Sequence, residues 1–206
     1  MFPVSASAAY KVALSFIIFT ASLTNISTSD TRIMSEYASI TGWGKCIQPA
    51  VLTNDEIATI IYTSDEWIRT RSCNAERRVS HVPCSDLAAV AAQRALATAD
   101  GEMEDVDLLI VATCTPDTVI PSTAAHVQRK IGASNAAVFD LNAGCSGFIY
   151  GLSVATAMIR SGAVKKAIVM GAERVCVFLC WAVRDAGVVC GVCAGAVGVV
   201  AAVAES

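Results

Sequence analysis

One residue, Cys145, lies where a nucleophile could act. It falls between an apolar run that predicts a buried strand over 136–141 and a helical spacing of apolar residues over 147–160. The residues between them are mostly small and predict a sharp turn. A thiol at the start of a helix faces unpaired N–H groups and the positive end of the helix dipole, which favour the thiolate. We therefore predict that Cys145 is a nucleophile.

The chain has nine cysteines, and most free cysteines are small buried hydrophobic residues, so position alone singles out Cys145. The odd number and scattered spacing favour reduced thiols in a cytoplasm over disulfides. Four of them have a spacing that a zinc site could use: Cys176, Cys180, Cys190 and Cys193. Because the residues between them are apolar, a buried strand is the favoured interpretation there, and no metal site is expected.

The composition is that of a folded, markedly apolar protein. Of the 206 residues, 54% are hydrophobic and 16% are charged, which excludes a disordered chain and allows a sizeable core. The formal net charge of −3 gives no general electrostatic reason to bind nucleic acid.

Strand and helix patterns alternate along the chain. Strands are predicted over 38–47, 107–112, 136–141 and 166–171, and helices from Thr53, from Ser64, over 84–99, over 121–131 and over 147–160. Residues 73–78 are expected in a loop. The alternation predicts an α/β fold with a mainly parallel sheet.

The two ends of the chain differ from the rest. Residues 1–33 contain a short apolar run that resembles a secretory signal, but Met34 could be a start, so we favour an upstream extension followed by a domain over 34–206. Residues 186–204 carry no charge. Their glycines and valines favour a strand, a turn and a buried last strand at 194–203 over the alternative, a membrane helix.

Several motifs together are more specific than any one of them. With them, residues 36–185 resemble the N-terminal half of β-ketoacyl-acyl-carrier-protein synthase III, a family with the thiolase fold. The motifs are TSDEWIRTR at 63–71, ERR at 76–78, DLNAGCSGFIY at 140–150, SGAV at 161–164 and WAVR at 181–184.

The resemblance implies a fold and an activity. The fold is one half of a thiolase-like domain, a mixed and mainly parallel sheet with a buried helix after the catalytic cysteine. Cys145 would be acylated by acyl-CoA, and the acyl group would then be condensed with malonyl-acyl-carrier protein in fatty-acid chain initiation. Acyl-CoA would be the substrate, and no bound cofactor is implied. The enzyme would be cytoplasmic and would form a homodimer edge to edge through the strand before the cysteine.

The resemblance also assigns residues to coenzyme A. Trp67 and Arg184 match residues that hold the adenine from opposite sides, and Arg71 matches a residue near the phosphates. Flat indole and guanidinium groups suit such stacking. Three neighbouring arginines would attract phosphopantetheine or an acidic carrier protein, unless they form only a solvated face: Arg69, Arg77 and Arg78.

The chain departs from the family pattern at several points. The family's second half, which carries a histidine and an asparagine for condensation, is expected to be absent, so condensation is in doubt and a large apolar face would favour self-association. Cys73-Asn74 replaces the usual Gly-Ile, Gly144 replaces Ala, and residues 191–195 lack the usual Asp. The alternatives are an inactive half-domain and a cysteine-rich metal-binding or membrane-associated protein.

Overall fold

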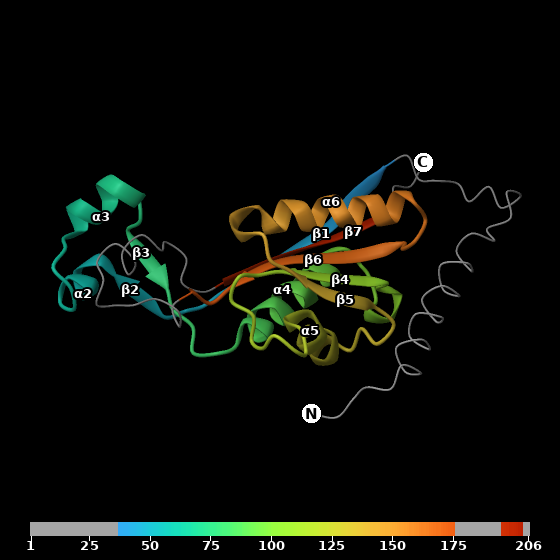
Figure 1. The fold of residues 1–206 in the computed structure, drawn as a ribbon, viewed down its shortest axis with the longest axis horizontal. Coiled ribbons are helices and arrows are strands. Elements are labelled where there is room, and N and C mark those ends of the chain that lie inside the picture. Colours follow the sequence, from blue (N-terminus) through green and yellow to red (C-terminus); the bar gives the residue numbers. More distant parts are fainter. Residues whose placement is uncertain (1–36, 176–194, 204–206) are drawn as a thin grey trace, which may run out of the picture. The chain divides into compact units, whose positions relative to one another are not determined.

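The computed structural model describes residues 37–175 and 195–203, all within one unit of the chain, Ser35–Ser206. Five strands form its main sheet (Figure 1). In spatial order they are β1 (Ala38–Ile47), β7 (Gly195–Val203), β6 (Lys166–Glu173), β4 (Leu108–Ala112) and β5 (Ala137–Leu141). Among the described residues, no helix is long and apolar enough to cross a membrane.

The sheet is mixed, as predicted. β4 pairs in parallel with β5 and β6, whereas β7 pairs antiparallel with both β6 and β1. Four of the five strands therefore point the same way, and β7 alone is reversed. Because residues 195–203 are paired on both sides as a strand, the membrane-helix alternative is wrong for that part of the tail.

Helices cover both faces of the sheet (Figure 1). α4 (Cys84–Thr98) and α5 (Thr123–Ile131) pack on one face, and α6 (Gly147–Arg160) packs on the other. A single 3-10 turn, Met103–Asp105, separates α4 from β4. Each of these helices begins and ends within about two residues of its predicted bounds. At α5 the signals are a capping serine, Ser122, and a C-terminal glycine, Gly132.

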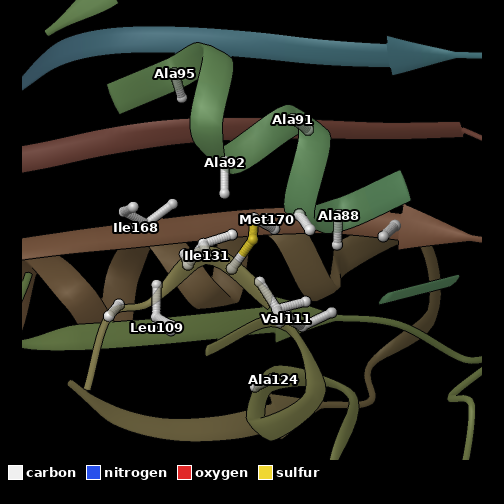
Figure 2. Close-up of a cluster of buried hydrophobic side chains, with 14 of the residues drawn as sticks. Ala88, Ala91, Ala92, Ala95, Leu109, Val111, Ala124, Ile131, Ile168 and Met170 are labelled. Atoms are coloured by element: carbon white, nitrogen blue, oxygen red, sulfur yellow. The ribbon is translucent and has the colours of Figure 1, made fainter. Parts of the chain in front are cut away.

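The central strands are apolar on both sides because both of their faces are covered. Along β4, Leu109 and Val111 join the core under α4 and α5, while Leu108 and Ile110 join the core under α6. Figure 2 shows the first of these cores, in which alanines of α4 face larger side chains of β4 and β6. This alternation is the period of two expected for a strand.

Glycines on β1 and alanines on α4 let the strand and the helix approach each other closely. A β-carbon added to Gly42 would lie against the carbonyl oxygen of Ala95, and one added to Gly44 would lie against that of Ala91. The contact is completed by Arg94, which donates a hydrogen bond of 2.7 Å to the carbonyl oxygen of Lys45. The glycines of the first strand are therefore required by packing rather than by turn geometry.

Residues 51–78 form a separate small substructure. It contains β2 (Val51–Thr53), α2 (Asn54–Ala58), α3 (Asp65–Ser72) and β3 (Glu76–Arg78), and β2 pairs antiparallel with β3. Two buried isoleucines, Ile57 and Ile68, form its core. The start of α2 has the predicted capping box, in which Thr53 and Glu56 exchange hydrogen bonds.

Two predictions about local structure are wrong. Residues 76–78 form a strand and not a loop, because they pair with β2, which lies more than twenty residues earlier in the chain. β5 is not fully buried: as an edge strand, it leaves most of its side chains half-buried and Ala137 exposed.

Candidate active site

Cys145 occupies the predicted turn between β5 and α6. The turn is a 3-10 turn, Gly144–Ser146, and α6 begins directly after it at Gly147. Gly144 has a φ of 58°, a left-handed conformation that glycine adopts without strain. The Cys145 side chain is exposed, so it is accessible to a reactant.

Small residues let the first turns of α6 pack closely against the sheet. Gly147 and Gly151 are buried, and a β-carbon on Gly151 would lie 2.9 Å from Val169 of β6. A β-carbon on Gly147 would lie 3.2 Å from the β-carbon of Ala112 at the end of β4. This close packing fixes the start of α6, and with it Cys145, at the ends of β4 and β6.

The N-terminus of α6 has no side-chain cap. Neither Ser146, at the N-cap position of α6, nor Ala143, at that of the 3-10 turn, makes a side-chain capping hydrogen bond. The first N–H groups of a helix have no partner within the helix. The N–H of Gly147 donates to the carbonyl oxygen of Gly144. Because the N-cap side chain forms no capping hydrogen bond, the positive end of the helix dipole remains near Cys145.

A cavity of about 360 Å³ lies beside Cys145. Its walls come from the ends of β4 and β6, the cysteine turn and the first turn of α6. The residues lining it are Ala112, Cys114, Thr115, Gly144, Cys145, Phe148, Gly171, Ala172, Glu173 and Val175. Most of these are apolar, so the cavity suits an aliphatic group next to the thiol.

Sequence reasoning missed the polar residues of this cavity. The Glu173 carboxylate accepts hydrogen bonds from the Cys114 N–H at 2.8 Å and from the Thr115 hydroxyl at 2.7 Å. The Cys114 thiol donates to the side-chain oxygen of Asn142 at 3.3 Å. A signal was present, because the carboxyl ends of neighbouring parallel strands meet at one edge of a sheet, where sites are common.

Trp67 and Arg71 lie together on α3, outside the set of residues that lines the cavity. The guanidinium of Arg71 is stacked over the Trp67 ring, 4.5 Å from its centre. Ser64 caps the helix by accepting a hydrogen bond from the Trp67 N–H. α3 therefore presents a preformed stack of an indole and a cation.

The other three predicted arginines have different surroundings. Arg69 forms an ion pair with Asp65, and Arg78 forms one with Glu76. Arg77 is only 1% exposed and donates a hydrogen bond to Asn54. The expectation that Arg77 faces a ligand is therefore not met, since its charged group points into the small substructure.

Several predicted residues lie outside the described residues: Arg184, Cys176, Cys180, Cys190, Cys193 and the 1–33 extension. Within the described ranges, no group of three or more His, Cys, Asp or Glu side chains could hold a metal ion.

Comparison with known proteins gives consistent matches. A family model described as 3-oxoacyl-[acyl-carrier-protein] synthase III matches residues 139–206. The β-ketoacyl-[acyl-carrier-protein] synthase III 2 of Vibrio vulnificus (strain YJ016) is 55% identical over 161 residues, which are 78% of this chain and 44% of the relative. A synthase III of Alkalilimnicola ehrlichii is 48% identical over 164 residues, 78% of this chain and 51% of the relative.

Solved structures agree with these sequence matches. The crystal structure of 3-oxoacyl-[acyl-carrier-protein] synthase III from Aquifex aeolicus is 40% identical with a TM-score of 0.79, covering 82% of this chain and 55% of that one. The priming β-ketosynthase from the R1128 polyketide pathway is 28% identical, also with a TM-score of 0.79, covering 82% of this chain and 51% of that one.

The fold and the cysteine turn define the class first: this is part of a thiolase-like domain. The sequence matches then identify the family. The chain belongs to the 3-oxoacyl-[acyl-carrier-protein] synthase III family, and it spans about half the length of the curated relatives it matches.

Proposed function

We propose that Cys145 accepts an acyl group from acyl-CoA and holds it as a thioester. The observation that carries the proposal is the position of this exposed thiol, which lines the cavity at the uncapped start of α6. Exposure gives access, and the positive end of the helix dipole lies beside the attacking sulfur. The apolar cavity provides room for the acyl chain.

The proposed step is a thioester exchange. The Cys145 thiolate attacks the carbonyl carbon of acyl-CoA, a new C–S bond forms, and the bond from that carbon to the sulfur of coenzyme A breaks. Coenzyme A leaves as a thiolate and takes a proton from solvent. The step exchanges no electrons, so no cofactor is needed. Acyl-CoA is the substrate.

We assign coenzyme A recognition to Trp67, Arg71 and Arg184. The stack of Arg71 on Trp67 supports this assignment, because it shows that the indole face already accepts a flat cation. An adenine would stack on the indole in place of Arg71. Arg69 and Arg78 remain weaker candidates for phosphate or carrier-protein contact, since carboxylates already pair with them.

The wider role is suggested by the relatives, which are named as β-ketoacyl-[acyl-carrier-protein] synthases III. We propose that the protein acts in fatty-acid chain initiation in the cytoplasm, with acyl-CoA and malonyl-acyl-carrier protein as partners. Incubation of the 206-residue chain with both partners tests condensation separately from acylation. A β-ketoacyl product would establish it, and its absence would restrict the chain to the first half-reaction.

Homodimer formation is proposed through the edge of the sheet at β5. The support is that β5 is an edge strand with half-buried side chains. Exposed apolar residues elsewhere, Trp43 on β1 and both Ile149 and Tyr150 on α6, favour further self-association. Light scattering tests both, because a monodisperse monomer would contradict them.

Acylation itself is tested by mass spectrometry after incubation with acetyl-CoA. We expect a mass increase of one acetyl group, located on the peptide that contains Cys145. Cys145→Ala should lose the adduct, whereas Cys73→Ser, which removes another exposed thiol, should keep it. An adduct that survives Cys145→Ala, or none in the parent chain, would contradict the proposal.

A further inference from the structure

Glu173 joins the end of β6 to the loop that follows β4. Its two carboxylate oxygens accept separate hydrogen bonds, one from the backbone of Cys114 and one from the hydroxyl of Thr115. The Thr115 hydroxyl in turn accepts a hydrogen bond of 2.8 Å from the Arg174 N–H. The carboxylate therefore clamps two consecutive residues of the loop to the strand.

The clamped residues form part of the wall of the cavity that Cys145 also lines. Cys114 and Thr115 both line the cavity, and so does Cys145. From its fixed backbone, Cys114 extends its thiol to the Asn142 side chain, three residues before Cys145. Glu173 thus connects three parts of the site: the end of β6, the loop after β4 and the turn that carries the nucleophile.

We propose that Glu173 is a positioning residue that sets the width of the acyl cavity and so restricts the size of the group that reaches Cys145. The inference rests on the proposed role of Cys145 as the nucleophile. It adds that selectivity for small acyl groups depends on a carboxylate that forms no bond to the substrate.

The hydrogen bonds favour positioning over proton transfer. A general base needs an oxygen that can reach the proton it removes. Both oxygens of Glu173 already accept bonds from the loop, at 2.8 and 2.7 Å. Glutamine keeps one oxygen to accept from the Cys114 N–H, and its amide can donate to the Thr115 hydroxyl. Glu173→Gln should therefore preserve the clamp, whereas Glu173→Ala removes it.

Asp107 provides a matched control. Like Glu173, it is a carboxylate that accepts two hydrogen bonds, but here both come from backbone N–H groups, of Lys165 at 2.7 Å and of Lys166 at 3.1 Å. These bonds join the start of β6 to the start of β4, at the opposite end of the strands from the cavity. Asp107→Ala should lower the free energy of unfolding as Glu173→Ala does, without altering the cavity wall.

The experiment measures how fast Cys145 reacts with two maleimides, N-methylmaleimide and the bulkier N-benzylmaleimide. Rates are followed by mass spectrometry of the peptide that contains Cys145, and the readout is the ratio of the two rate constants. In Glu173→Ala the ratio should shift toward the bulkier reagent by about 10-fold, the order expected when a wall moves by a fraction of an ångström. Glu173→Gln and Asp107→Ala should keep the parent ratio.

Three results would overturn the inference: an unchanged ratio in folded Glu173→Ala, an equal shift in Asp107→Ala, or a shift in Glu173→Gln as large as in Glu173→Ala. Circular dichroism of each variant confirms that it is folded. If Glu173→Ala does not fold, the shorter Glu173→Asp replaces it, because it reaches only one of the two donors and should shift the ratio in the same direction. Maleimides need no coenzyme A, so failure of acetyl transfer and failure of the clamp are observed separately.

Discussion

In the part of the chain that the structure describes, two helices begin beside a cysteine, and the two cysteines have opposite surroundings. Cys84 is the first residue of α4, and Cys145 lies two residues before the first residue of α6. Cys84 is 1% exposed, whereas Cys145 is exposed and lines the cavity. A helix start is therefore not sufficient to make a nucleophile.

The helices also differ in whether a carboxylate accepts hydrogen bonds from their first N–H groups. At α4, the Asp117 carboxylate accepts hydrogen bonds from the N–H groups of Cys84 and Ser85. At α5, Asp140 accepts 2.7 Å bonds from two N–H groups in the same way. α6 has no such side-chain cap. Burial raises the pKa of the Cys84 thiol to about 12, and the charges of Asp117 and Glu173 act in the same direction.

The largest effect on stability is expected at the capped helix. Asp117→Ala leaves two N–H groups of α4 without their acceptor, and we expect a loss of about 3 kcal/mol in the free energy of unfolding, the sum for two bonds to a charged group. Urea denaturation measures it. Asp117→Asn, which keeps one acceptor oxygen, should lose less. An unchanged unfolding midpoint in Asp117→Ala would show that the cap contributes nothing.

A carboxylate added at the N-terminus of α6 should make that helix start resemble the start of α4, which has one. Ser146→Asp places a negative charge at the N-terminus of α6, next to Cys145, and repels negative charge on the attacking sulfur. We expect alkylation of Cys145 by iodoacetamide to slow by about 10-fold, equivalent to roughly 1.4 kcal/mol. Ser146→Asn has nearly the same shape without the charge and should react as the parent does. Equal slowing in both variants would point to sterics instead.

The free energy of unfolding at high pH should depend on the buried thiol of Cys84. The pKa of Cys84 is raised to about 12 from the ordinary thiol value of 9.0, so the folded state keeps a proton that the unfolded state releases. The contribution is fully present below about pH 9 and is lost as the pH rises toward 12, by at most ~1.4 kcal/mol per pH unit. Urea denaturation at several pH values should show a shallower decline in Cys84→Ala. Identical slopes would contradict the assignment.

A smaller effect is expected at the turn that carries the nucleophile. Gly144 has a left-handed φ, and a β-carbon there would meet nothing within 4 Å, so strain in the backbone is the only penalty. Gly144→Ala should cost about 1 kcal/mol in the free energy of unfolding. Differential scanning calorimetry measures the shift in Tm. A stabilised variant would show that the turn adopts another conformation.

Several elements could be predicted because their signals are local. α6 spans 147–160 and β1 spans 38–47, as predicted, since each has a clear periodicity and small or turn-forming residues at its ends. The capping box of α2 could be predicted equally well, because all of its residues lie within one turn. The position of Cys145 between a strand and a helix followed from these signals.

What could not be predicted depends on contacts between distant residues. Arg77 and Arg78 are adjacent and alike in sequence, but only Arg77 is buried, because Asn54 bonds to it from 23 residues away. The strand at 76–78 exists because it pairs with β2. Glu173 and Cys114 reach the site through the order of the strands in the sheet, which no local pattern specifies.

The most direct test of the account compares three cysteines in the folded chain. Alkylation by iodoacetamide, followed peptide by peptide, gives a rate constant for Cys145 at a helix start, for exposed Cys73 just after the last residue of α3, and for buried Cys84. We predict that Cys145 reacts at least about 10-fold faster than Cys73, because the positive end of the helix dipole stabilises negative charge on the attacking sulfur, and that Cys84 remains unmodified. Equal rates for Cys145 and Cys73 would contradict the claim that the start of α6 activates the nucleophile.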